Sequence, residues 1–277
     1  MIAPSDLSLL DGLERALLNN RLHMAYQPKI SLTDGKLKRV EALVRWEHPE
    51  RGSISPSQFV PLAERHGLID ELTQWGLRTA LRQWRIWRDE GIDTTLAFNI
   101  SALSLDQLDF PDLVERIAKA LEVPPEALVL ELTEGATQPL VKLMDTLTRF
   151  RIKGIGLAID DFGVGYSTLM QLRQLPFTEL KIDRFFVDDA ATARDSMLIV
   201  RSIIELAHGL DLTVTAEGVE TTAQLRLLRR LGCDVAQGFL IARPLAPEAL
   251  GPWIEEWRDR WPVLAADAPL LDLVASR

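Results

Sequence analysis

The sequence predicts an α/β protein that forms one closed, TIM-like (β/α)8 barrel, with a first strand antiparallel to its neighbour. About eight short apolar segments are typical of strands, and most are followed by a helix at a spacing of roughly 20–35 residues, as βα units require. The turn at Asp34 and Gly35 joins two of these segments too closely for a parallel pair. No linker or low-complexity segment divides the 277 residues, so we expect a single domain over 1–277 with its core at about 7–260.

The composition is ordinary for a soluble globular protein, with 47% hydrophobic and 26% charged residues. A net charge of −9 argues against a broad nucleic-acid-binding surface, although metal ions could still recruit a small phosphorylated ligand. The single cysteine, Cys233, excludes an internal disulfide and a cysteine-based zinc site. The N-terminus lacks the pattern of a signal peptide and no apolar run is long enough to cross a bilayer, so we expect a cytoplasmic protein with no membrane segment.

In the first half of the chain, apolar residues recur at helical spacing in some segments and run continuously in others. The expected elements are an entry helix over 7–20, strands over 23–32 and 37–46, a helix opened by Pro56 and Ser57, a longer helix with Gly91 as its C-cap, a strand over 95–100 and a helix ending at Leu121. Pro28 cannot donate a ladder hydrogen bond, so it indicates an edge, a bulge or a strand end. Ser104 and Gln107 resemble a capping box at the start of the helix that ends at Leu121.

The second half repeats the alternation of strand and helix. We expect strands over 128–132, 156–160, 180–183, 212–216 and 235–238, and helices around 140–147, 197–207 and 225–231. Pro124 and Pro125 end the helix before the first of these strands, and Pro247 opens a last helix that runs through Trp257. The apolar tail from Trp261 is expected to pack back onto the domain, with a helix around 270–274.

The stretch over 156–167 is the one around which the rest of the chain is organised. An apolar run, typical of a buried parallel strand, delivers Asp160 and Asp161 to its C-terminal end, and a loop with Gly163 and Gly165 follows. Adjacent strand residues point to opposite faces, so the strand must end here and the turn must re-aim Asp161. Two carboxylates this close repel unless a cation lies between them, and one or two divalent metal ions are the natural partner. A solvated turn is the alternative, because Asp and Gly also favour turns.

Polar residues recur at or near the ends of the other expected strands. In a barrel these ends converge on one mouth, where the catalytic residues of this architecture lie. One buried acid could form a structural salt bridge, but several acids around one opening would repel one another. Oxygen ligands from Glu, Asp and Asn suit Mg²⁺ or Mn²⁺. The residues concerned, of which the first lies within its strand, are Glu41, Asn99, Glu131, Asp160, Asp161, Lys181, Asp183, Glu217, Glu220 and Gln237.

With these residues the chain resembles the EAL family of cyclic di-GMP phosphodiesterases. The name-giving stretch is Glu41-Ala42-Leu43, and the other family motifs stand in order along the chain, at expected strand ends. They are Tyr26-Gln27-Pro28, Asn99-Ile100-Ser101, Glu131-Leu132-Thr133-Glu134, Asp160-Asp161-Phe162-Gly163, Lys181-Ile182-Asp183, Glu217-Gly218-Val219-Glu220 and Gln237-Gly238-Phe239. The resemblance extends from about Leu13 to Pro244 and beyond. It implies hydrolysis of one phosphodiester bond of cyclic di-GMP to linear pGpG, which lowers the level of this bacterial second messenger.

The resemblance also implies a role for each matching residue. Two Mg²⁺ or Mn²⁺ ions, about 3.5–4 Å apart, would share a hydroxide and clamp the phosphate for in-line attack. Their implied ligands are Glu41, Asn99, Glu131, Asp160, Asp161 and Glu217. Lys181 would orient or help to deprotonate the water, Glu217 is the other candidate base, and Glu41 is counted with them as catalytic. Glu134 would brace the loop after the two aspartates, and the substrate groove would be shaped by Gln27, Leu43, Arg45, Asp183, Glu220, Gln237 and Pro244.

One position departs from the commonest pattern of the family. Val164 stands where threonine or alanine is more usual, in the loop linked in this family to metal binding and dimerisation, and implies a changed rate or loop stiffness. A catalytically silent cyclic di-GMP receptor is the alternative to an enzyme, and the intact acids together with Lys181 favour the enzyme. The resemblance further implies a homodimer and sensory or cyclase domains in a longer parent chain. Ca²⁺ is expected to be inhibitory, because it polarises water less than Mg²⁺.

Overall fold

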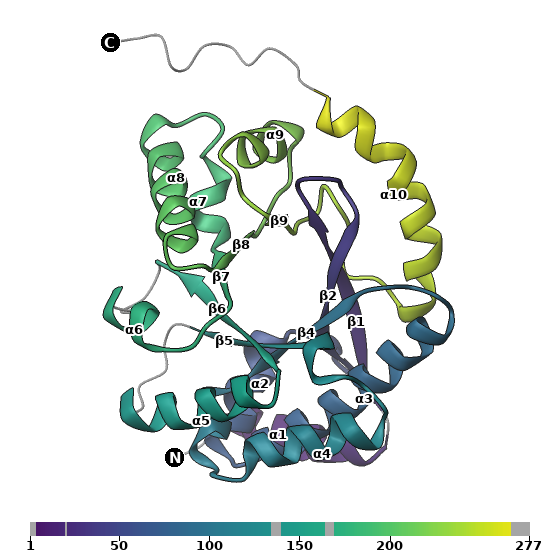
Figure 1. Ribbon diagram of the computed structural model, residues 1–277. Helices are drawn as coiled ribbons and strands as arrows, with labels where there is room; N and C mark the ends of the chain where they lie inside the picture. Colours follow the sequence, from purple (N-terminus) through teal and green to yellow (C-terminus); the bar gives the residue numbers. More distant parts are fainter. Residues whose placement is uncertain (1–3, 20, 134–139, 164–168, 267–277) are drawn as a thin grey trace.

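The computed structural model of the chain is a closed barrel (Figure 1). The structure describes residues 4–19, 21–133, 140–163 and 169–266. Within these ranges eight strands close into a ring in the order β1-β9-β8-β7-β6-β5-β4-β2, and β3 pairs with β2 outside the ring. The strands are β1 (Leu22–Ser31), β2 (Leu37–His48), β3 (Gly52–Ile54), β4 (Thr95–Ile100), β5 (Leu128–Thr133), β6 (Gly156–Phe162), β7 (Glu179–Ile182), β8 (Thr213–Ala216) and β9 (Val235–Ala236). None of the helices in the described ranges has the length and apolar character needed to cross a membrane.

The first two strands form the antiparallel hairpin that the sequence predicts. β1 pairs in antiparallel fashion with β2 and, near its end, with β9, whereas the other neighbours in the ring are parallel. The register of the hairpin shifts between Lys29 and Ile30, so the irregularity lies one residue beyond Pro28. Gly35 belongs to the turn and has a φ of 74°, a conformation that glycine adopts without strain.

The helices lie around the outside of the ring (Figure 1). They are α1 (Pro4–Leu18), α2 (Pro56–Arg65), α3 (Ile69–Asp89), α4 (Phe110–Ala120), α5 (Leu140–Ile152), α6 (Leu169–Gln174), α7 (Arg184–Asp188), α8 (Arg194–His208), α9 (Thr222–Arg230) and α10 (Leu250–Ala265). The sequence does not predict the short elements α6, α7 and β3, because segments of this length hold too few residues to show a hydrophobic period. The helix expected around 270–274 falls outside the described residues.

The capping box predicted at Ser104 and Gln107 is wrong. Ala102–Asp106 forms a separate 3-10 helix that is capped by the hydroxyl of Ser101, and α4 begins only after it. The side chains of Ser104 and Gln107 donate instead to the carboxylate of Asp70 on α3, the former at 3.2 Å. A carboxylate from a neighbouring helix has therefore replaced the local backbone as the partner of both side chains.

The main hydrophobic core lies between the ring and the surrounding helices. Helix α3 shows the pattern, because Leu77, Leu81 and Trp84 recur at helical spacing and are buried in this core. The ring of Trp87 on the same helix packs edge-on against Tyr26 of β1, with 4.7 Å between the ring centroids. Fully burying one large apolar side chain contributes roughly 1.5–3 kcal/mol to stability. The packed ring is thus a rigid frame for the side chains that face its interior.

The interior of the ring is polar. Arg39 of β2 forms an ion pair with Glu179 of β7, and the contact crosses the interior because β2 and β7 are not neighbours in the ring. Glu179 also accepts from the hydroxyl of Thr215 at 2.5 Å, and Arg39 donates to Thr95 at 3.0 Å. These buried groups are tolerated because each one is paired. Two residues further along their strands, on the same inner face, lie Glu41 and Lys181.

Candidate active site

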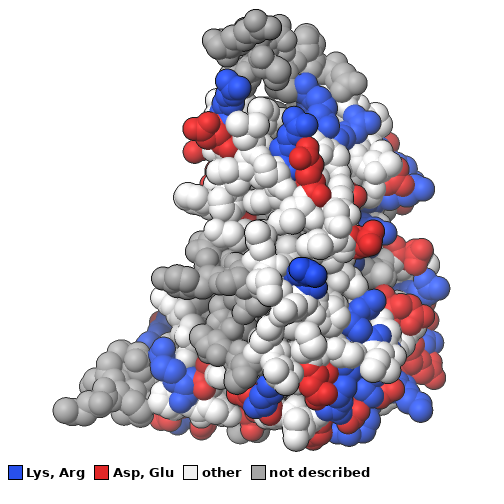
Figure 2. Space-filling model, turned by 60° about the vertical axis from the view of Figure 1, so that its left-hand side comes forward, with Lys and Arg blue, Asp and Glu red and all other residues white. Residues whose placement is uncertain are grey.

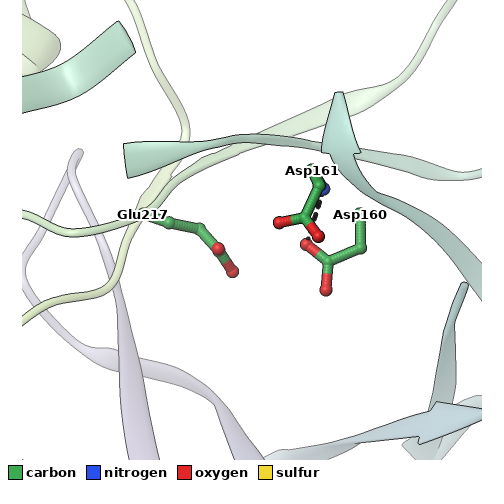
Figure 3. Close-up of side chains that lie close together, drawn as sticks. All are labelled: Asp160, Asp161 and Glu217. Carbon is green, nitrogen blue, oxygen red and sulfur yellow. Dashed lines mark hydrogen bonds between the residues drawn. The ribbon is translucent and has the colours of Figure 1, made fainter. Parts of the chain in front are cut away.

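The expected acids converge on the carboxyl end of the parallel strands. Glu131 lies on β5, Asp160 and Asp161 lie on β6, and Glu217 directly follows β8. Figure 3 shows the last three side chains pointing into the same space, two from β6 and one from the segment after β8. One carboxylate oxygen from each of these three residues lies within 4.8 Å of the other two. The barrel therefore brings together acids that are far apart in the sequence.

The ammonium group of Lys181, on β7, lies among these carboxylates. Its side chain is 1% exposed, and its Nζ lies 2.7 Å from Glu131, 2.8 Å from Asp160, 2.7 Å from Glu217 and 3.9 Å from Glu41. Burial by itself would lower the pKa of a lysine, but the surrounding acids outweigh this effect and hold the pKa of Lys181 well above its ordinary value. Lys181 therefore remains a cation inside the acid cluster.

Glu41 is held by several donors at once. Its Oε1 accepts from Nδ2 of Asn99 at 2.7 Å, and its Oε2 accepts from Nε2 of Gln237 at 2.8 Å and lies 3.3 Å from Nζ of Lys29. Burial would raise the pKa of Glu41, but the charges of Lys181 and Lys29, aided by the two amide donors, bring the pKa below its usual range. Glu41 is therefore ionised, and both of its oxygens are fixed in orientation.

The backbone turns at Asp161, which has a φ of 53°. Among residues other than glycine, such values are uncommon, and aspartate and asparagine adopt them most readily. The sequence predicts that the strand ends at these two acids and that a turn re-aims Asp161, and β6 ends one residue later, at Phe162. The change of direction coincides with an irregularity in the pairing of β6 with β7, between Ile159 and Phe162. The backbone N–H of Asp161 donates to Oδ1 of Asp160 at 2.9 Å, so the two acids are held side by side.

Two of the acids are shifted towards the protonated form. Burial, followed by the charges of Asp160 and Asp183, raises the pKa of Asp161 to about 6. Burial also raises the pKa of Glu217 to about 8, and the charge of Lys181 offsets this effect only in part. A divalent cation among these oxygens would reverse both shifts, because it stabilises the ionised carboxylates.

The donor set fits hard divalent cations. Five carboxylates share the site with two ammonium groups, those of Lys181 and Lys29, which leaves three formal negative charges. The ligand atoms on offer are oxygens, which Mg²⁺ and Mn²⁺ prefer. In the described ranges, Asp160, Asp161 and Glu217 form the group whose oxygens are close enough to share an ion. The expected ligands that adjoin this group through hydrogen bonds and ion pairs are Glu41, Asn99 and Glu131.

Two cavities adjoin the acid cluster and contain most of the residues expected to shape a substrate groove. The smaller cavity, of about 220 Å³, is lined by Gln27, Glu220 and Gln237 together with four members of the cluster. The larger cavity, of about 640 Å³, is mainly apolar and is lined by Leu43, with Asn99 among its few polar groups. The polar recess is thus lined by carboxylates of the cluster, and the apolar recess borders the cluster through Asn99, which donates to Glu41.

The remaining expected residues take other positions. Arg45 is half-buried on β2 and donates to a backbone carbonyl of the same strand at 2.9 Å. Asp183 caps α7 by accepting from the backbone N–H two residues further on at 2.8 Å, and it lies beside Asp161. Pro244 is half-buried in the segment that follows β9. Glu134 and Val164, which the resemblance places in supporting loops, fall outside the described residues.

Sequence reasoning assigned no role to three residues that lie at this site. Lys29 is buried against Glu41. Its place at the site could have been predicted, because it lies two residues after Gln27 and therefore on the same face of the strand. Arg184 and Phe239 line the smaller cavity. Each lies at the end of a motif or directly after one, at a strand end, so their positions also pointed to the mouth of the barrel.

Comparison with known sequences indicates one family. The chain matches the EAL domain over residues 11–244. It is 44% identical over 250 residues to the bifunctional diguanylate cyclase/cyclic di-GMP phosphodiesterase MucR of Pseudomonas aeruginosa. It is 40% identical over 249 residues to the cyclic di-GMP phosphodiesterase PA2567 of the same organism. These matches cover 90% and 89% of this chain but 36% and 42% of the relatives, so the chain spans less than half of their length.

Comparison with solved structures agrees with the sequence match. The MucR phosphodiesterase in complex with c-di-GMP has a TM-score of 0.83 and 44% identity, with 88% of this chain and 99% of that chain covered. The EAL enzyme Bd1971 has a TM-score of 0.84 and 30% identity, with 91% of this chain and 70% of that chain covered. The family match covers most of the chain, including every acid of the cluster. The chain therefore belongs to the EAL domain family.

Proposed function

We propose that this chain hydrolyses one phosphodiester bond of cyclic di-GMP, giving linear pGpG and lowering the level of the second messenger. The observation that carries the proposal is the cluster of Asp160, Asp161 and Glu217 around a buried lysine, in a chain of the EAL family. The names of two relatives and the MucR structure with c-di-GMP support the choice of substrate. The proposal includes a longer parent chain with sensory or cyclase domains, and the length of MucR and the cyclase in its name support the cyclase domain.

The residues of the cluster divide the chemistry among them. When bound, divalent ions would neutralise charge on the phosphate and lower the pKa of a water molecule. Glu217 accepts the proton of the attacking water, because a bound cation would keep its carboxylate ionised and it lies beside Asp160 and Asp161, where that water would be held. Lys181, 2.7 Å from Glu217, orients that water and stabilises negative charge on the phosphate. The water oxygen bonds to phosphorus, the bond from phosphorus to the 3′ oxygen breaks, and that oxygen takes up a proton from solvent.

The two cavities provide places for the rest of the nucleotide. The larger cavity has ample volume for a guanine base, and its apolar lining, which includes Leu43, suits the faces of the ring. Arg45 suits a phosphate oxygen, because its guanidinium presents a fork of donors. Asp183 suits the donor edge of a guanine, and Gln27 and Gln237 offer amide groups in the smaller cavity.

Turnover of cyclic di-GMP with different metals tests the proposal. We expect pGpG to form with Mg²⁺ or Mn²⁺ and to stop forming when a chelator is added. We expect Ca²⁺ to permit substrate binding without turnover, because it takes more ligands at longer distances and polarises water less. Chromatography measures pGpG, and calorimetry measures binding. Binding without pGpG under every metal would identify a receptor instead, and full turnover with Ca²⁺ as the only metal would contradict the metal assignment.

The same proposal includes a homodimer. The exposed large apolar side chains of α6, α7 and α8 are Leu169, Met170, Phe185, Leu198 and Ile199. Figure 2 shows a broad area of uncharged side chains on this side of the molecule. Such an area suits a partner, and a second copy of the chain would supply a matching surface. Gly163, which follows the acids of β6, approaches the ring of Phe186 on α7 closely, so a contact here reaches the chain beside the acids.

Met170→Glu is expected to convert the dimer to a monomer and to lower turnover per chain at least about fivefold. Burying a charge in an apolar interface is costly, so the two copies of the chain would separate. Loss of the contact between them would loosen the chain beside the acids. Light scattering measures the assembly, and turnover at a series of dilutions measures the coupling. Val263→Glu places the same charge at an exposed position of α10, on the other side of the barrel (Figure 1), and should change neither. A monomeric Met170→Glu variant with undiminished turnover would rule out the coupling.

A further inference from the structure

Lys29 lies on the inner face of β1, where its side chain is 0% exposed. Its Nζ is 2.5 Å from Oε1 of Glu131, which is 102 positions away in the sequence, and 3.3 Å from Oε2 of Glu41. Burying an unpaired ammonium group costs several kcal/mol, so a lysine persists in such a place only when it is paired. Both of its partners are acids that adjoin the group able to share an ion.

Glu131 is held between two lysines. Lys29 contacts Oε1, and Lys181 contacts Oε2 at 2.7 Å. Lys181 also contacts Asp160 and Glu217, so Oε2 is the oxygen of Glu131 on the side of the acid cluster. With Oε1 taken by Lys29, Oε2 is the oxygen that Glu131 can offer to a cation in the cluster. Lys29, on β1, thereby fixes the orientation of Glu131, an expected metal ligand on β5.

Lys29 also changes the charge of the site. The five carboxylates and two lysines of the cluster leave three formal negative charges, before Asp183 beside Asp161 is counted. Lys29 supplies one of the two positive charges, which opposes the approach of divalent ions and favours the single negative charge of the phosphodiester group. Without Lys29 the loaded site would carry one positive charge fewer when the phosphodiester arrives. The metal-free site would carry one negative charge more and attract divalent ions more strongly.

We propose that Lys29 is a positioning residue of this site, which orients Glu131 and Glu41 and weakens metal binding in order to leave positive charge for the phosphodiester. The role of the phosphodiester in this proposal rests on the proposed function. The effect of Lys29 on metal binding does not rest on it, because metal binding can be measured without substrate.

Calorimetry of Mn²⁺ binding to Lys29→Met tests the proposal. We expect Mn²⁺ to bind about tenfold more tightly than in the unmodified chain, because one nearby positive charge is lost. We expect turnover at saturating Mn²⁺ to fall about tenfold, because Glu131 loses the partner of one oxygen and the phosphodiester meets a less positive site. Tighter metal binding with slower turnover is a combination that a merely structural role would not produce, since loss of structure weakens binding or leaves it unchanged.

Two variants serve as matched controls. Arg39→Met also removes a buried cation from the interior of the barrel. Its ion pair is with Glu179 and its hydrogen bond is with Thr95, whereas Glu131 of the cluster feels the charge of Arg39 only without direct contact. We expect it to destabilise the fold while Mn²⁺ affinity changes by less than about threefold. Lys29→Arg keeps the positive charge, so its Mn²⁺ affinity should also stay within about threefold of the unmodified chain.

A folding defect does not prevent the measurement. If Lys29→Met does not fold without metal, its unfolding temperature over a series of Mn²⁺ concentrations reports the affinity. Lys29→Gln removes the same charge and retains a hydrogen-bond donor for Glu131, so it should also bind Mn²⁺ more tightly. Unchanged or weaker Mn²⁺ binding in both variants would overturn the proposal, and so would equally tight binding in Arg39→Met. Failure of the unmodified chain to produce pGpG would count against the proposed function and not against this inference.

Discussion

Replacing Asp161 with asparagine is expected to lower turnover of cyclic di-GMP by about 10²-fold or more, while substrate affinity changes by less than about tenfold. Asparagine keeps the shape of the side chain and tolerates the positive φ at this position, so the backbone should be preserved. It removes a negative charge and a strong metal ligand from the group formed with Asp160 and Glu217. The two cavities that we assign to the nucleotide are left intact, so binding should suffer less than chemistry.

Calorimetry of substrate binding and chromatography of pGpG would separate the two effects of Asp161→Asn. Asp112→Asn makes the same chemical change on α4, where the carboxylate is partly exposed and pairs with Lys153 and Arg149. Its turnover and substrate affinity should match those of the unmodified chain. Equal losses of affinity and turnover in Asp161→Asn would mean that this residue shapes the groove and does not act in catalysis.

Replacing Lys181 with methionine is expected to lower the free energy of unfolding of the metal-free protein by about 3–5 kcal/mol. Its Nζ lies within 4.0 Å of four carboxylates. Without Lys181 these carboxylates would repel one another, and Lys29 would be the ammonium group that remains in contact with the cluster. Turnover should fall about 10²-fold or more, because the group assigned to orient the water is lost. Denaturant unfolding and pGpG formation measure the two effects, and Mn²⁺ should restore part of the stability by supplying positive charge.

Lys153→Met provides the comparison for Lys181→Met. Lys153 also contacts two carboxylates, those of Asp112 and Glu115, but these acids are close to half exposed. Solvent screens such pairs, so the loss of stability should be about 1 kcal/mol or less, and turnover should not change. Similar losses of stability in the two variants would show that burial does not strengthen the role of Lys181.

The order of strands and helices could be predicted because it rests on local patterns. The hairpin turn at Asp34 and Gly35, the apolar runs and the helical periods each lie within a short stretch of sequence, and the structure contains the corresponding elements. The prediction failed where a distant group competed with the local one. Ser104 and Gln107 have the spacing of a capping box, yet both donate to Asp70, which approaches only when α3 packs beside them.

The acids of the site could be predicted as a set for a related reason. Parallel strands end at the same edge of a barrel, so residues at strand ends share a neighbourhood whatever their separation in sequence. Glu131, Asp160, Asp161 and Glu217 were therefore expected together, and the structure places them together. The sequence also predicts that the backbone turns to re-aim Asp161, but the irregular pairing of β6 with β7 at this point could not be predicted, since it depends on a partner strand.

The sequence by itself determined the strand and helix pattern, the antiparallel start and the ring of acids, because these follow from periodicity, turn chemistry and position along each strand. Only the tertiary structure decided which charges are paired and how strongly. Lys29 meets Glu131 across 102 positions, Arg39 meets Glu179 through the interior, and Lys29 lies 3.3 Å from Glu41 but acts on Glu217 only at longer range. Burial and these contacts bring the pKa of Glu41 below its usual range and raise that of Glu217 to about 8, although both are glutamates beside Lys181. The physical reason is that pKa depends on distances to groups from other strands, and closure of the barrel sets those distances.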